Sequence, residues 1–192
     1  MKPLLVIGAS SFGKLVHAIA EDCGRVVAGY IDDVNAGPGI LGGRADLLSR
    51  FSPAEYEVVM AIGYSHMTAR LAIFEEVSAA GFAFPALVHP RALVNPRSDI
   101  GTGCIVMAGA NVDAFTTIEP LCVLWPSATV SHDSVIGRNT FVSPGATLCG
   151  FVRVGASSFI GAGSVIINGS HMPEHGFVKA GTRFHQPASE AR

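Results

Sequence analysis

The sequence predicts two domains of different architecture: an α/β domain with a short parallel sheet over residues 1–85, then a parallel β-helix over residues 86–170. Two observations predict this division. The first part alternates strand-like and helix-like segments, an order typical of a parallel α/β sheet. From residue 94 onward an aliphatic residue recurs at every sixth position, which is typical of hexapeptide β-helix repeats. Residues 171–192 are expected to form a C-terminal tail.

The elements of the first domain follow from short apolar runs and from helical periodicity. The run "LLVIG" (4–8) enters a glycine turn and predicts a buried strand, and residues 13–23 carry aliphatic side chains at helical spacing. Two further strands are predicted at "VVAGYIDD" (26–33) and "YEVVMAIG" (56–63). Residues 66–80 predict another amphipathic helix, which ends at a glycine. The domain is therefore expected to be a small Rossmann-like parallel α/β unit.

The second domain is defined by its repeat. Thirteen consecutive anchor positions, six residues apart from 94 to 166, hold only Val, Leu or Ile. Four residues after each anchor from 94 to 160 stands Ser, Cys, Ala or Thr, with Val152 as the exception. Each six-residue unit is predicted to be one short strand and a corner. The anchor points inward, and the small residue fits where the chain bends.

Composition excludes several classes of function. Charged residues make up 15%, against about 25% in an average protein, which suggests that part of the surface is covered by copies of the chain itself. The net charge of −2 gives no basic face for nucleic acid, and no apolar run reaches the roughly 18 residues of a membrane span. The opening run is too short for a signal peptide, and the four cysteines lack CxxC spacing. A cytoplasmic homo-oligomer is expected.

Several segments resemble one bacterial family. They are "IGASSFGK" (7–14), "YIDD" (30–33), "VSHDSVIG" (130–137) and "GATLCG" (145–150), together with the length and position of the repeat. The chain resembles the nucleotide-sugar N-acetyltransferases of the NeuD/PglD type, which are hexapeptide-repeat acyltransferases. The resemblance implies a left-handed β-helix in which three repeats make one triangular coil of 18 residues.

A coil of that length brings distant residues together at one corner. Residues 18 apart lie one above another, so Gly150 is expected directly over His132. The place of His132 in its repeat holds proline in other repeats, which predicts an outward corner; these are Pro90, Pro96, Pro120, Pro126 and Pro144. An imidazole beside a glycine N–H pairs a proton acceptor with an oxyanion donor, as acyl transfer requires. Asp133 is expected to orient the imidazole.

The resemblance also implies roles for these residues and for the donor site. His132 would be the general base, Asp133 its supporting acid, and the Gly150 N–H the donor to the thioester oxyanion. Acetyl-CoA, the co-substrate, would lie in a groove between neighbouring β-helices of a homotrimer, near Ser143, Gly161 and Ala162. No resident cofactor or metal is implied.

For the acceptor, the resemblance implies a UDP- or GDP-linked 4-amino sugar held between the first domain and a corner of the β-helix. The glycine loop would approach the phosphates at a helix start, and the acidic pair would contact the base or ribose. The expected substrate-binding residues are Gly8, Ser10, Gly13, Asp32, Asp33 and Tyr64.

Four departures from the family pattern leave alternatives open. Phe12, Tyr64 and Trp125 stand where the family usually has polar residues, and "AGTRFH" (180–185) replaces the family's terminal segment. One alternative is an acyltransferase of the same fold with a non-sugar amine or hydroxyl acceptor. Another is a non-catalytic trimeric nucleotide-binding protein. A zinc hydro-lyase is disfavoured, because a three-His site is needed and the repeat from 94 to 166 holds only His132.

Overall fold

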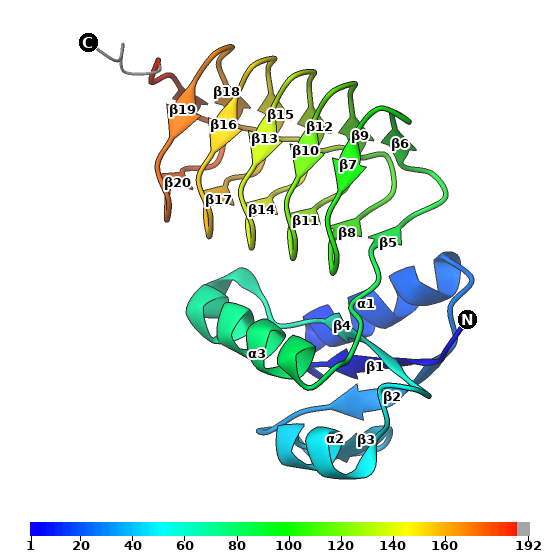
Figure 1. The fold of residues 1–192 in the computed structure, drawn as a ribbon. Coiled ribbons are helices and arrows are strands. Elements are labelled where there is room, and N and C mark those ends of the chain that lie inside the picture. The colour runs from blue at the N-terminus through cyan, green and yellow to red at the C-terminus, as the bar shows by residue number, and fades with distance from the viewer. Residues whose placement is uncertain (188–192) are drawn as a thin grey trace. The chain divides into compact units, whose positions relative to one another are not determined.

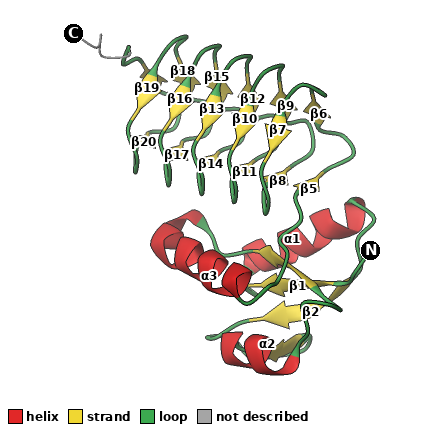
Figure 2. Ribbon diagram, viewed as in Figure 1, coloured by secondary structure: helices red, strands yellow, loops and turns green. Residues whose placement is uncertain are grey.

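The computed structural model describes residues 1–187 and divides the chain into two compact units. The first unit is Met1–Leu87, and the second begins at Val88. This boundary lies two residues from the predicted one. Figure 1 shows helices and a small sheet in the first unit and a stack of short strands in the second. Figure 2 shows that the helices are confined to the first unit.

The first unit is a four-stranded parallel sheet in the order β3-β2-β1-β4. The predicted strands and helices are confirmed, with ends within a few residues of expectation, but the sequence did not predict β3 or α2. The elements are β1 (Leu4–Ile7), α1 (Ser11–Asp22), β2 (Val27–Ile31), β3 (Ile40–Gly42), α2 (Arg44–Arg50), β4 (Glu57–Met60), the 3₁₀ turn η1 (Tyr64–His66) and α3 (Met67–Ala79).

Its core forms around the central strand. All four residues of β1 are at most 2% exposed, as expected for a strand covered on both faces. Helix α1 turns Val16 and Ile19 toward this core, and α3 contributes Ile73 and Val77. Residues buried on both sheet faces explain why the strands read as continuous apolar runs in the sequence.

The second unit is a parallel β-helix with three sides. Its strands are two residues long, and each of three sheets collects every third strand, so that residues 18 apart are paired. The strands are β5 (Leu87–Val88), β6 (Leu93–Val94), β7 (Asp99–Ile100), β8 (Ile105–Val106), β9 (Asn111–Val112), β10 (Thr117–Ile118), β11 (Val123–Leu124), β12 (Thr129–Val130), β13 (Val135–Ile136), β14 (Phe141–Val142), β15 (Thr147–Leu148), β16 (Arg153–Val154), β17 (Phe159–Ile160) and β18 (Val165–Ile166).

The repeat pattern is explained by packing inside the coils. Every anchor from Val106 to Ile166 is at most 3% exposed. The small residues that follow by four positions are buried at the bends, and several of them donate to a carbonyl 15 residues further on. For example, the Thr116 hydroxyl donates to the Ser131 carbonyl at 3.0 Å. A large side chain at these places would displace the next coil, which accounts for the restriction to small residues.

The corners have a regular backbone conformation. The third residue after each anchor has φ between +54° and +72° at every sixth position from 103 to 181. Glycine, asparagine and aspartate enter this left-handed region most readily. Here it is also adopted by residues such as Phe115, Phe151 and Asp133, because the pairing of the strands on both sides holds the corner. The side chain before Asp133, that of His132, therefore projects from a rigid bend.

The predicted end of the β-helix is corrected by the structure. Three further strands, β19 (His171–Met172), β20 (Phe177–Val178) and β21 (Arg183–Phe184), continue the three sheets. Their inward places are taken by Met172, Val178 and Phe184. Two of these three residues are not Val, Leu or Ile, so the aliphatic repeat stops in the sequence while strand pairing continues. Residues 171–184 thus belong to the β-helix rather than to a separate tail, and the last five residues lie outside the described part.

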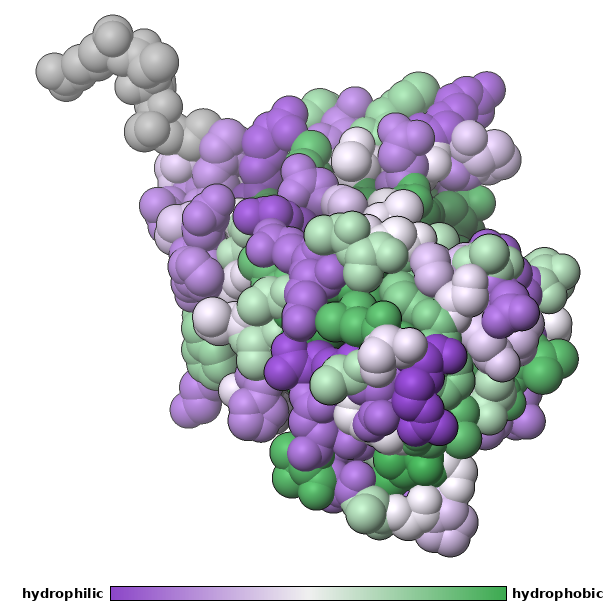
Figure 3. Space-filling view, turned by 60° about the horizontal axis from the view of Figure 1, so that its bottom comes forward, coloured by the Kyte–Doolittle hydropathy of each residue, from purple (hydrophilic) through white to green (hydrophobic). Residues whose placement is uncertain are grey.

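The surface mixes polar and apolar residues (Figure 3). Among its large apolar side chains, Leu93 is 69% exposed and Phe177 is 70% exposed. Within residues 1–187, no helix has the length and apolar character needed to cross a membrane.

Candidate active site

The corner between β12 and β13, residues 131–134, carries the histidine singled out by the sequence; we call it the His132 corner. The His132 Nδ1 lies 2.9 Å from Asp133 Oδ2, and the two side chains are 46% and 42% exposed. An ionised carboxylate can only accept hydrogen bonds, so this contact places the ring proton on Nδ1. In the neutral tautomer with its proton on Nδ1, the lone pair is on Nε2.

Gly150 lies against this imidazole, as the 18-residue register predicts. Strand pairing places Thr129 beside Thr147 and Val130 beside Leu148, so His132 and Gly150 share one edge of the β-helix. A Cβ built on Gly150 would lie 2.7 Å from His132 Cε1 and 2.8 Å from Nε2. The imidazole therefore occupies the space that any other side chain at position 150 would need.

The two backbone polar groups of Gly150 differ in their hydrogen bonding. Its carbonyl accepts from the Gly169 N–H at 3.0 Å. Its own N–H donates to no group within residues 1–187. An amide hydrogen without an internal partner, next to a histidine lone pair, is the donor that a developing oxyanion needs. The structure thus brings His132 and Gly150 together at one corner, as the sequence predicts.

Two phenylalanines flank this edge. The Phe151 ring meets the His132 ring edge-on, with centroids 5.1 Å apart, and Phe151 is 53% exposed. Phe115, one coil before Asp133, is 62% exposed. No sequence motif singles out either residue, although both occupy the same place of the repeat as Asp133. Exposed aromatic rings therefore lie in the coils next to Asp133 on this edge.

The expected donor-site residues lie on another edge. Ser143 and Gly161 directly follow β14 and β17, which neighbour each other in a different sheet from β12 and β15. Gly161 is buried: a Cβ built on it would lie 2.4 Å from the backbone nitrogen of Ala180. Ala162, in contrast, is exposed. One copy of the chain therefore places these residues and His132 at two different corners of the same β-helix.

The first unit contains a pocket of about 410 Å³ at the carboxyl ends of its strands, within the range of small-molecule sites. Four of the predicted substrate-binding residues line it: Gly8, Ser10, Asp32 and Asp33. The pocket also has lining residues that the sequence analysis did not single out, among them Asn35, Arg44 and His66. Because they lie beyond the glycine loop and the acidic pair, no local motif indicated them.

Two predicted residues do not line this pocket. Gly13 is buried in α1, where a Cβ would lie 2.1 Å from the Gly8 carbonyl oxygen. Its lack of a side chain allows the helix to approach the end of β1, so the glycine serves packing. Tyr64 begins η1 and is 52% exposed, although its neighbour Gly63 is among the lining residues.

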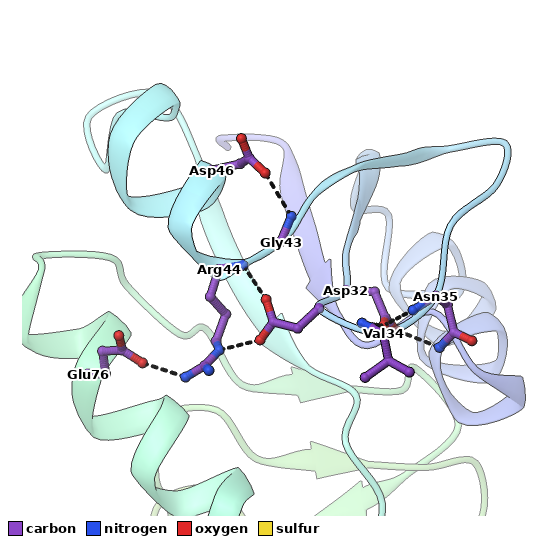
Figure 4. Close-up of polar contacts among 8 residues, drawn as sticks. Asp32, Val34, Asn35, Gly43, Arg44, Asp46 and Glu76 are labelled. Atoms are coloured by element: carbon purple, nitrogen blue, oxygen red, sulfur yellow. Dashed lines mark hydrogen bonds and ion pairs between the residues drawn. The ribbon is translucent and has the colours of Figure 1, made fainter.

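Asp32 organises the rim of the pocket. Its carboxylate accepts a hydrogen bond from the Ala9 N–H at 2.7 Å. It also accepts from the Val34 N–H at 2.9 Å, the Asn35 N–H at 2.7 Å and the Asn35 side chain (Figure 4). Burial by itself would raise the pKa of Asp32, but these hydrogen bonds outweigh it and lower the pKa to about 2. The carboxylate thus joins the glycine loop to the segment after β2.

Asp33 is engaged with Arg44. It accepts from the backbone N–H of Arg44 at 2.7 Å and from its Nε at 2.5 Å, and these contacts lower the pKa of Asp33. The same guanidinium reaches Glu76 of α3 at 2.8 Å (Figure 4). Both acidic side chains expected to contact the nucleotide are therefore also held by groups of the protein.

Replacing Asp32 with asparagine is expected to destabilise the first unit in a pH-dependent way. The folded pKa of Asp32 is below the reference value of 3.8, so its stabilisation is fully present above about pH 4 and is lost as the pH falls toward 2. Solvent screening reduces the effect to about 1 kcal/mol at pH 7. Urea unfolding of both proteins should show this difference at pH 7 and nearly none at pH 2. A difference that does not change with pH would contradict the assignment.

Comparison with known proteins agrees with this architecture. The family described as PglD N-terminal domain matches residues 3–77, and the bacterial transferase hexapeptide family (six repeats) matches residues 133–168. The acetyltransferase domain of PglB from Neisseria gonorrhoeae FA1090 is 31% identical, with a TM-score of 0.92, over 99% of this chain and 94% of that one.

Two structures with bound ligands are also similar. The same PglB domain in complex with acetyl coenzyme A has 33% identity and a TM-score of 0.87, over 94% of this chain and 89% of the other. PerB from Caulobacter crescentus, in complex with CoA and GDP-perosamine, has 28% identity and a TM-score of 0.89, over 98% and 92%. Within residues 1–187, no cluster of three or more His, Cys, Asp or Glu is placed to hold a metal ion.

Because of the similarity to the PglB domain over nearly the whole chain and the two family matches, the chain belongs to the acetyl-CoA-dependent nucleotide-sugar N-acetyltransferases of the PglD type.

Proposed function

We propose that this chain transfers an acetyl group from acetyl-CoA to the 4-amino group of a UDP- or GDP-linked sugar, with His132 as the general base. The observation that carries the proposal is the position of His132 Nε2, 2.8 Å from where a Cβ on Gly150 would lie. The N–H of Gly150 has no hydrogen-bond partner within residues 1–187. The PerB complex with CoA and GDP-perosamine supports an amino sugar nucleotide as acceptor.

In the proposed reaction, the neutral amine attacks the thioester carbonyl and a C–N bond forms. His132 Nε2 takes the proton that the nitrogen loses, while the Nδ1 proton stays hydrogen-bonded to Asp133. The Gly150 N–H donates to the oxygen that becomes negative in the tetrahedral intermediate. The C–S bond then breaks, and the imidazolium returns its proton to the CoA thiolate.

The pocket of the first unit is the proposed nucleotide site. Its rim includes Gly8 and Ser10 at the start of α1, where backbone N–H groups favour phosphate. Arg44 adds a cation to the lining, and Asn35 adds an amide able to contact a base. His66 supplies a further polar group on the opposite loop.

The active unit is proposed to be a homotrimer. His132 and the residues Ser143, Gly161 and Ala162 lie on different edges of one β-helix, so a single copy cannot present both sets to one thioester. A neighbouring copy that packs its Ser143 edge against the His132 edge would complete the donor site. The low content of charged residues is consistent with a surface partly covered in this way.

The test is release of CoA thiol from acetyl-CoA by the purified full-length chain, with UDP- and GDP-linked 4-amino sugars offered separately. Acceptor-dependent release and a mass increase of one acetyl group on the sugar nucleotide are expected. The matching 4-hydroxy sugar nucleotide and a simple amine serve as comparison acceptors. Release with none of the amino sugar nucleotides would overturn the proposal, and transfer only to the simple amine would assign a non-sugar acceptor.

A further inference from the structure

The edge that carries His132 continues past Gly150 to a polar side chain with no assigned role. Positions 132, 150, 168 and 186 hold His, Gly, Asn and Gln in successive coils. The pairing of β12 with β15 and of β15 with β18 sets this order, and Figure 1 shows these strands in neighbouring coils. Gly150 has no side chain, and we call the place beside its Cα where the His132 ring and the Asn168 side chain both approach the notch.

Asn168 faces this notch. Its Oδ1 lies 3.2 Å from the position of a Cβ built on Gly150, and His132 Nε2 lies 2.8 Å from the same point. The Asn168 side chain is exposed and makes no hydrogen bond within residues 1–187. Two hydrogen-bond acceptors, an imidazole nitrogen and an amide oxygen, therefore lie at the same notch, beside Gly150.

We infer that Asn168 orients the acceptor amine, an inference that rests on the proposed function. A neutral primary amine has two N–H bonds and one lone pair. When His132 Nε2 accepts one N–H and Asn168 Oδ1 accepts the other, the lone pair has only one direction left. With the thioester oxygen on the Gly150 N–H, this direction leads to the thioester carbon. Such fixed geometry raises the fraction of bound substrate that can react.

The proton balance assigns different tasks to the two acceptors. The N–H that points to His132 loses its proton as the C–N bond forms. The N–H that points to Asn168 stays on nitrogen and becomes the N–H of the amide product. Asn168 therefore keeps its hydrogen bond throughout the reaction and takes no proton, so it positions the nitrogen rather than acting as a base.

This arrangement discriminates between amine and hydroxyl acceptors. A hydroxyl group has one O–H, which His132 must accept for the attack to occur. Asn168 Oδ1 is then left without a donor from the reacting atom and does not help the reaction. Asn168 is thus expected to accelerate transfer to nitrogen and to have little effect on any transfer to oxygen.

The experiment compares Asn168→Leu and Asn168→Asp with the unaltered chain. Leucine has a similar shape and accepts no hydrogen bond, whereas aspartate keeps an acceptor oxygen. We expect Asn168→Leu to lower kcat for the amino sugar nucleotide by roughly 10- to 100-fold, the size of one hydrogen bond to a reacting group, with KM changed by less than about threefold. Asn168→Asp should stay within about fivefold of the unaltered kcat.

Gln186→Leu, which removes an exposed amide one coil further along the same edge, is the matched control and should leave kcat unchanged. Thermal unfolding should give the same Tm for all four proteins. An unaltered chain that acetylates no amino sugar nucleotide overturns the proposed function and this inference with it. If the unaltered chain is active and Asn168→Leu is equally active, the inference alone is overturned. It is also overturned if Asn168→Asp is slower than Asn168→Leu. That result would mean that the Nδ2 of Asn168 donates to the thioester oxygen.

Discussion

Replacing His132 with alanine is expected to lower kcat by roughly 10²–10⁴-fold, the usual contribution of a general base. The amine must lose a proton as it attacks, and Nε2 of His132 is the acceptor beside the unpartnered N–H of Gly150. The fold should be unaffected, because the side chain is 46% exposed and its contacts with Asp133 and Phe151 lie within one edge. Steady-state assays with saturating acetyl-CoA and acceptor measure the loss.

Two variants define the specificity of that result. Asp133→Asn removes the charge but keeps a residue that readily adopts the local φ of +57°, so its loss should be smaller than that of His132→Ala. His171→Ala alters a histidine of β19, two coils beyond β13 in the same sheet, and should leave kcat unchanged. A chain in which His132→Ala is as active as the unaltered protein would exclude His132 as the base and favour a non-catalytic role for the edge.

Adding a single methyl group at Gly150 is expected to reduce kcat by at least about 100-fold. The new Cβ would lie 2.7–2.8 Å from two atoms of the His132 ring, closer than van der Waals contact allows, so the ring must move. Displacement of a reacting group by about 1 Å costs activity on this scale. The methyl group would also obstruct the approach of the thioester oxygen to the Gly150 N–H.

The stability of Gly150→Ala should change by less than about 1 kcal/mol, because the half-exposed ring can rotate into solvent. In a His132→Ala background there is no ring to displace, so the same methyl group should cost less than it does in the unaltered chain. The four proteins of this cycle are compared by kcat and by Tm. Equal losses from the methyl group in both backgrounds would show that Gly150 and His132 act independently.

Much of the fold could be predicted because its periodicities are strong. The six-residue repeat defines where each strand of the β-helix lies, since one buried aliphatic residue per strand is enough to hold it. The aliphatic pattern ends where Met172 and Phe184 occupy the inward position, so the sequence does not predict the last coil. In the first unit, β3 and α2 are three and seven residues long and too short for a clear period.

The site could be predicted only where the register determined it. Stacking at 18 residues brought His132 and Gly150 together without knowledge of side-chain positions. The pocket of the first unit depends on tertiary contacts instead. Arg44 reaches it through its hydrogen bonds to Asp33, and His66 reaches it through the turn at η1. Neither contact leaves a spacing pattern in the sequence, and Gly13 matched a binding pattern while serving helix packing.

The most direct measurement is a crystal structure of the protein with acetyl-CoA bound. We expect the thioester oxygen within hydrogen-bonding distance of the Gly150 N–H, its carbonyl carbon beside the notch, and His132 Nε2 facing the space where an amine would enter. We also expect a neighbouring copy to supply Ser143 and Ala162 to the pantetheine arm. A thioester bound at any other edge of the β-helix, away from both His132 and Gly150, would contradict the account.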